Sequence, residues 1–174
     1  SAGMLINTYL IQPNIVDNDI KDIKPSEELT WDEIKEKYPN VKFPEGMQLK
    51  YAEAYAQNTD LVGWLKIDKL KMDFPILQTD NDSYYLKRSF THRYTDLGNP
   101  FLAHANSIEP LDRNSIIYGH STRSSDKIFS KLFDYRTTRG FINNPIIEFN
   151  TIYHDYKWKV YAVFITNATT AEDN

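Results

Sequence analysis

From Leu61 onward the chain alternates short apolar runs with turn residues, and this spacing limits its fold more than any other feature. Runs rich in β-branched and aromatic residues occupy positions 63–67, 73–78, 115–118, 145–150 and 156–166. Polar clusters with Asp, Asn, Gly or Pro separate these runs, as in proteins built from many short strands. The pattern predicts a mainly β barrel or sandwich.

The last of these runs changes its pattern halfway along. Residues 156–160 alternate between apolar and charged side chains, whereas residues 161–165 are apolar throughout. Such a strand is expected to pass from a half-exposed position into a covered core. A closed barrel would need further strands beside it, so we expect a barrel that is incomplete at its C-terminal end, from a truncated chain.

The first 60 residues differ from the rest, because they carry six Lys against eleven Asp or Glu. Thr30 and Glu33 have the spacing of a capping box, which predicts a short helix that continues to Tyr38 and stops before Pro39. Residues 45–56 place Met47, Tyr51 and Tyr55 four apart, which predicts a second helix with an apolar packing face.

These patterns divide the chain into three parts. Residues 1–25 form a lead-in that starts with a Ser-Ala-Gly-Met sequence typical of a tag remnant. Residues 26–58 form a helical subdomain, and residues 59–174 form the β-barrel.

Composition narrows the possible functions. The 174 residues are 41% hydrophobic and 14% aromatic, enough for one core, and no apolar run is long enough to cross a membrane. The net charge of −4 argues against a nucleic-acid partner. Since the chain has no Cys and its four His lack paired ligand spacing, we predict no metal and no cofactor.

Four sequence blocks together resemble class B sortases. They read NTDLVGWLKI from Asn58, FPILQ from Phe74, DNDSYYL from Asp80 and IIYGH from Ile116. Their order, their gaps and the two preceding helices agree with that family over about residues 45 to 166. The resemblance implies a sortase-like eight-stranded β-barrel with N-terminal helices.

The resemblance also implies a reaction. Sortases are cysteine transpeptidases that cleave a sorting signal after Thr and pass the acyl group to an amine. The His that closes the Tyr-Gly-His block is catalytic in the family, which makes His120 the candidate catalytic residue; Tyr118 and Gly119 would shape the strand end that presents it. An imidazole at such a strand end suits general acid–base work near neutral pH.

The other parts of the family's active site have no counterpart in these residues. The family's Cys and Arg lie on later strands, so Arg123, Arg136 and Arg139 are not assigned to that role. Ser121 and Thr122 follow the His directly, where a side chain rarely reaches the imidazole in line. The chain by itself is therefore expected to be inactive.

One block departs from the family pattern. Class B sequences usually carry an Asp where this chain has Ala103, followed by His104. This change affects local hydrogen bonding that the Asp would supply, and His104 is expected to be solvated or to act as a cap.

The resemblance finally implies partners and a location. The partners would be a sorting-signal peptide of a surface protein and an amine of a peptidoglycan precursor or of a pilin. The protein would lie on the extracellular face of the membrane, held by an N-terminal anchor that these residues lack. The alternative is a non-catalytic sortase-like module that binds a peptide or partner without a nucleophile.

Overall fold

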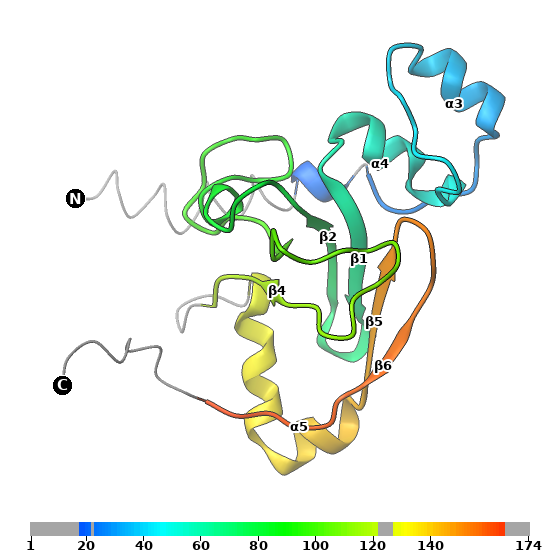
Figure 1. Cartoon of the computed structure of the whole chain (residues 1–174). Coiled ribbons are helices and arrows are strands. Elements are labelled where there is room, and N and C mark those ends of the chain that lie inside the picture. Colours follow the sequence, from blue (N-terminus) through cyan, green and yellow to red (C-terminus); the bar gives the residue numbers. More distant parts are fainter. Residues whose placement is uncertain (1–17, 22, 122–126, 166–174) are drawn as a thin grey trace.

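One curled six-stranded sheet forms the centre of the molecule (Figure 1). The structure is a computed structural model that describes residues 18–21, 23–121 and 127–165. The strands lie in the order β4-β3-β2-β1-β5-β6 across the sheet. Their bounds are β1 Leu61–Ile67, β2 Met72–Leu77, β3 Phe101–Leu102, β4 Ile117–Tyr118, β5 Ile146–Thr151 and β6 Lys157–Lys159.

The pairing is mixed, and the sheet does not close. β1 lies antiparallel between β2 and β5, and β5 pairs antiparallel with β6. On the other side β2 pairs parallel with β3, which pairs antiparallel with β4. In the described part of the chain β4 and β6 are thus the two edges of a half-barrel, as the sequence predicted for an incomplete barrel.

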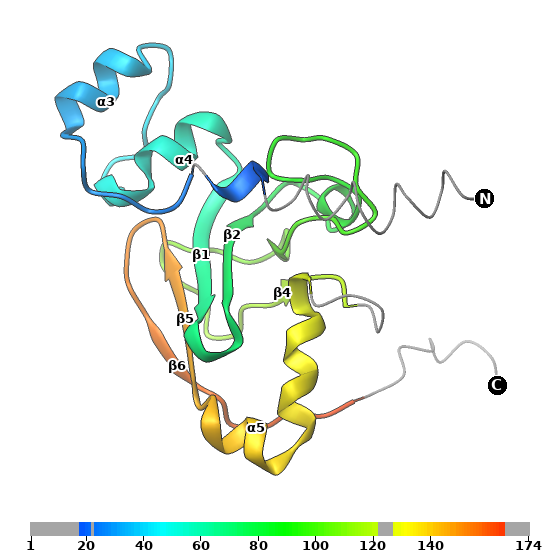
Figure 2. The same cartoon turned by 180° about the vertical axis from the view of Figure 1, so that it is seen from behind.

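Helices lie at both ends of the sheet (Figure 1, Figure 2). α3 and α4 lie at the end of the sheet where β1 begins. The yellow helix η5 runs from β4 to α5, which lies at the opposite end. The bounds are α3 Trp31–Lys37, η2 Leu49–Tyr51, α4 Ala52–Gln57, η3 Asp68–Leu70, η4 Tyr84–Leu86, η5 Ile128–Arg136 and α5 Thr138–Asn143. Within the described residues, none of these helices is both long and apolar enough to traverse a bilayer.

The first predicted helix is confirmed with its cap. The Thr30 hydroxyl oxygen accepts from the Glu33 N–H, and the Glu33 carboxylate accepts from the Thr30 N–H at 2.7 Å. The second helix starts later than predicted, at Leu49, because the Met47 N–H donates to the Pro44 carbonyl and closes a turn first. The predicted apolar residues do pack: Met47, in the turn before the helix, and Tyr51 are buried, and Tyr55 is half-buried.

Two hydrophobic clusters lie on opposite faces of the sheet. Neighbouring residues of β1 show this, because Trp64 packs in one cluster and Leu65 in the other, as the period of a strand requires. The first cluster joins the N-terminal helices to β1 and β2 and contains Ile34, Tyr51 and Tyr85. The second joins the sheet to η5 and contains Ile128 and Tyr135.

The predicted strand over 156–166 is wrong for most of its length. β6 ends at Lys159, and residues 160–165 form no strand. β6 ends there because its partner strand ends there: β5 begins at Ile146, which lies opposite Lys159. The last backbone hydrogen bond between the two segments runs from the Val160 N–H to the Pro145 carbonyl at 2.8 Å. Residue 166 lies outside the described residues.

Residues 161–165 consequently expose large apolar side chains, with Tyr161 95%, Phe164 81% and Ile165 69% exposed. We predict that the 174-residue chain self-associates through this segment. Phe164→Asp should raise the dissociation constant at least about tenfold, because a buried aromatic side chain contributes about 1.5–3 kcal/mol. Sedimentation velocity over a concentration series measures this.

The matched control is Ile142→Asp on α5, which removes another exposed apolar side chain. It should leave the association unchanged. A chain that stays monomeric throughout the series, or an equal effect of both variants, would contradict the prediction.

Candidate active site

His120 lies just beyond β4, and two hydrogen bonds fix it there. Its Nε2 donates to the Leu86 carbonyl at 2.9 Å, because a carbonyl oxygen can only accept. Its own carbonyl accepts from the Phe129 N–H at 3.0 Å, at the start of η5. The ring is half-buried, so it is held in place while part of it still reaches solvent.

The residues before His120 allow a close approach of η5. A Cβ at Gly119 would lie 2.6 Å from a carbon of the Phe129 ring, which leaves no room for a side chain. Tyr118 packs its ring 5.3 Å from that of Phe101, across the β3–β4 pair. Gly119 therefore lets Phe129 lie directly against the strand end that carries His120.

The Leu86 carbonyl belongs to η4, which a buried hydrogen-bond network ties to the start of β1. The Tyr85 hydroxyl donates to the Asp60 carboxylate at 2.7 Å and accepts from the Asn58 amide at 2.9 Å. Burial raises the pKa of Tyr85 above its ordinary value, so the hydroxyl keeps the proton that it donates. The Asn58 amide also reaches the Phe90 carbonyl.

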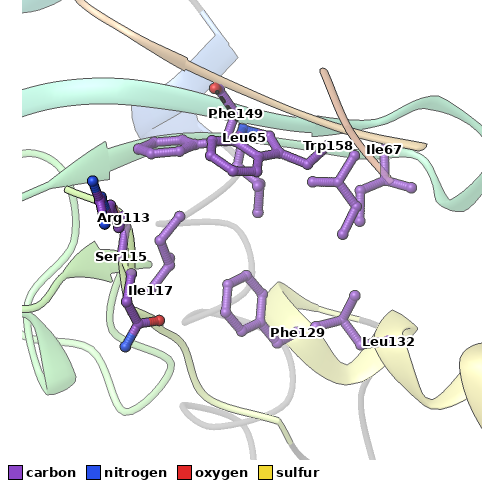
Figure 3. A pocket seen from close by; sticks show the side chains of 11 residues that line it. Leu65, Ile67, Arg113, Ser115, Ile117, Phe129, Leu132, Phe149 and Trp158 are labelled. Atoms are coloured by element: carbon purple, nitrogen blue, oxygen red, sulfur yellow. Dashed lines mark hydrogen bonds between the residues drawn. The ribbon is translucent and has the colours of Figure 1, made fainter. Parts of the chain in front are cut away.

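A mostly apolar cavity of about 360 Å³ opens beside this site (Figure 3). Side chains of the sheet lie on one side of it and Phe129 and Leu132 of η5 on the other. The lining residues are Leu65, Ile67, Arg113, Asn114, Ser115, Ile117, Phe129, Leu132, Ile147, Phe149 and Trp158. His120 does not line the cavity. Phe129 connects His120 to it, since the Phe129 backbone binds the His120 carbonyl and the Phe129 side chain lines the cavity.

His104 is capped by a carboxylate from another block. The Asp82 carboxylate accepts from the His104 backbone N–H at 2.7 Å and lies 3.0 Å from its Nδ1. These bonds, the backbone one foremost, lower the pKa of Asp82. Asp82 thus supplies a carboxylate next to Ala103, where the sequence lacks the expected Asp.

Two of the arginines that follow His120 in the sequence, Arg136 and Arg139, lie on η5 and α5. Arg136 lies seven residues along η5 from Phe129, about 14 Å at the rise of a 3₁₀-helix. Its guanidinium stacks over the Phe133 ring, and Arg139 is in α5. Ser121 is exposed, while Thr122 and Arg123 lie outside the described residues.

Among the described residues no group of three or more His, Asp or Glu side chains is placed to hold a metal ion. The side chain in this site that could transfer a proton is the imidazole of His120, the residue that the sequence predicts as catalytic. The sequence predicted His120 as the candidate catalytic residue, but it gave no indication of the contacts of His120 with the Leu86 carbonyl and Phe129, or of Arg113 in the cavity lining. Leu86 closes a block that the family resemblance contains, whereas nothing in the sequence marks Phe129 or Arg113.

The chain is thus a curled half-barrel with helices ahead of its sheet and a Tyr-Gly-His sequence that starts in β4. No protein-family model matches the chain. Sortase B of Staphylococcus aureus is 27% identical over 150 residues, which cover 85% of this chain and 60% of that protein. Sortase B of Listeria monocytogenes is 32% identical over 109 residues, covering 63% of this chain and 44% of that protein.

Solved structures of sortase B are also similar to the chain. Sortase B from Listeria monocytogenes matches with a TM-score of 0.61 and 31% identity, over 65% of this chain and 64% of that one. The Staphylococcus aureus sortase B–substrate complex matches with a TM-score of 0.64 and 25% identity, over 75% of this chain and 58% of that one. The chain is therefore similar to sortase B proteins in sequence and in fold, and it spans less than two thirds of the length of these relatives.

The Tyr85 network generates a stability prediction. Tyr85→Phe removes the hydroxyl and leaves the Asp60 carboxylate without its 2.7 Å donor. We expect the free energy of unfolding to fall by about 1–3 kcal/mol, the cost of an unsatisfied buried polar group. Urea denaturation measures it, and Tyr94→Phe, at an exposed tyrosine, is the control. Equal effects of both variants would contradict the role of the network.

The Asp82–His104 pair generates a pH prediction. Because the pKa of Asp82 is lowered in the folded state, its contribution to stability is present above its unfolded pKa and is lost as pH falls through its folded pKa. Asp82→Asn should therefore lower the thermal midpoint at neutral pH and have less effect in acid. Asp80→Asn, at a carboxylate bonded to Asn81, is the control. A difference that stays constant from neutral pH into acid would refute it.

Proposed function

We propose that this chain is the His-bearing part of a cell-surface cysteine transpeptidase. In this proposal His120 is the general acid and base, and the thiol and the oxyanion-binding Arg come from residues outside this 174-residue chain. The single observation that carries the proposal is the placement of His120. His120, half-buried just beyond an edge strand, is hydrogen-bonded through Nε2 to the Leu86 carbonyl, and its own carbonyl binds Phe129, whose ring lines an apolar cavity.

The reaction would be acyl transfer. A Cys thiolate attacks the amide after Thr of a sorting signal related to Asn-Pro-x-Thr, and the imidazolium of His120 protonates the leaving amine. An acceptor amine then attacks the thioester and gives its proton back to the imidazole. The acceptor would belong to a peptidoglycan precursor or to a pilin.

Solved relatives support peptide and amine ligands. One matching structure is a Staphylococcus aureus sortase B–substrate complex, and another is sortase B complexed with Gly3, at 28% identity and a TM-score of 0.63. A mainly apolar trough with a few polar anchors is the kind of surface that holds an extended peptide. For this chain the location on the outer face of the membrane, with an N-terminal anchor, is part of the same proposal.

A second candidate is a peptide-binding module without catalysis, favoured by the absence of Cys from the chain. The two differ in what the gene encodes after Asn174. A Thr-Cys-containing strand followed by an Arg-bearing strand would support the transpeptidase, whereas a stop codon there would support the module. Fluorescence anisotropy with a labelled sorting peptide then shows whether the 174-residue chain binds one.

The central test is His120→Ala in the protein that carries the thiol. Transfer of a fluorescent sorting peptide to an amine should fall at least about 10²–10⁴-fold, the usual contribution of a general acid–base group. The free energy of unfolding should change by only about 1 kcal/mol, because one hydrogen bond is lost.

His154→Ala is the matched control, since the His154 side chain is exposed and its Nε2 lies 3.2 Å from the exposed Glu109 carboxylate. It should leave transfer unchanged. Undiminished transfer by the His120→Ala protein would overturn the proposed function.

A further inference from the structure

The hydrogen bond of His120 determines which ring nitrogen carries the proton. Nε2 lies 2.9 Å from the Leu86 carbonyl oxygen, which has lone pairs and no proton. This bond exists only when Nε2 bears a hydrogen, and a neutral imidazole bears one N–H in all. In the neutral ring the free lone pair is therefore on Nδ1.

We propose that the Leu86 carbonyl is the positioning group of the site: it holds neutral His120 in the Nε2–H form, so that Nδ1 is the nitrogen that exchanges protons. This inference rests on the proposed function for its catalytic meaning, but the tautomer itself does not. In the first half of the reaction the Nδ1–H bond breaks as the leaving amine gains that proton, the S–C bond forms and the C–N bond breaks. In the second half the acceptor amine returns a proton to Nδ1 as the thiolate leaves.

The carbonyl is held firmly enough to act in this way. Its residue ends η4, and the Tyr85 side chain next to it is tied to Asn58 and Asp60. The backbone of Tyr85 is bonded as well, since its carbonyl accepts from the Asn99 N–H at 3.0 Å. The Leu86 carbonyl shares its peptide plane with the Lys87 N–H, which donates to the Tyr84 carbonyl at 3.4 Å, so the backbone bonds of η4 also constrain its orientation.

Gly98 is what allows the next loop to pass against this carbonyl. Its φ is +61°, and a Cβ there would lie 2.7 Å from the Leu86 oxygen and 2.4 Å from the Tyr85 oxygen. Gly98→Ala would therefore push on both carbonyls and displace the acceptor of His120. Gly46 has a similar φ of +76° with nothing within 4 Å of its Cβ position, so Gly46→Ala introduces the same backbone strain without moving a carbonyl.

The experiment is NMR spectroscopy of the 174-residue chain labelled with ¹⁵N-histidine, at a pH where titration shows the ring of His120 to be neutral. We expect a pyrrole-type Nε2 and a pyridine-type Nδ1, and a directly observed Nε2-bound proton with a nuclear Overhauser contact to an α proton of Leu86 or Gly98. A pyridine-type Nε2, or an averaged mixture like that of histidine free in water, would overturn the proposal.

The two glycine variants test the positioning. Gly98→Ala should lose the signal of the Nε2-bound proton of His120, and Gly46→Ala should keep it. Equal spectra of the two variants would refute the role of Gly98 in placing the Leu86 carbonyl. If Gly98→Ala does not fold, the tautomer in the unchanged chain still decides the proposal. Failure of the proposed function is separate, because it appears as undiminished transfer by His120→Ala while the tautomer is as expected.

Discussion

The Tyr85 hydroxyl is the contact through which the N-terminal half of the molecule positions the candidate catalytic residue. It links Asn58 and Asp60, at the junction of α4 and β1, to η4. The next residue after Tyr85 supplies the carbonyl that binds His120. A tyrosine buried to this extent has to satisfy its hydroxyl, so the same bonds that stabilise the first hydrophobic cluster also fix the acceptor of the imidazole.

From the other side His120 is fixed by the second cluster. Phe129 binds the His120 carbonyl with its backbone and lies against Gly119 with its ring. That ring also lines the apolar cavity between the sheet and η5. His120 is therefore contacted from both sides of the sheet, by the Leu86 carbonyl next to the first cluster and by Phe129 of the second.

The sequence pattern predicted those strands of the sheet that pair along nearly their whole length with a neighbouring strand. β1, β2 and β5 were predicted within two residues of their ends, because each is an apolar-rich run that pairs with neighbouring strands along nearly its whole length. Residues 160–165 have an equally apolar pattern but form no strand, since β5 has no residue left to pair with them. β3 was missed because two residues, Phe101 and Leu102, are too short a run to show a period. At the site, His120 was predicted from the resemblance and stays a prediction, whereas the backbone carbonyl of Leu86 that binds it has no signature in a sequence.

The choice of a carbonyl in place of a carboxylate as the partner of His120 has a chemical consequence. A carboxylate orients an imidazole and also stabilises its cation by charge, as in serine proteases, where the cation forms only during the reaction. A cysteine nucleophile works as a thiolate, and its natural counter-ion is the imidazolium itself. A carboxylate beside the ring would compete with the thiolate for that cation.

In this structure the carboxylates of the neighbouring blocks are engaged elsewhere, Asp82 by His104 and Asp60 by Tyr85, and the ring receives a neutral acceptor. The Leu86 carbonyl thus orients His120 without adding negative charge, which leaves the cation available for the sulfur atom that the proposed reaction requires.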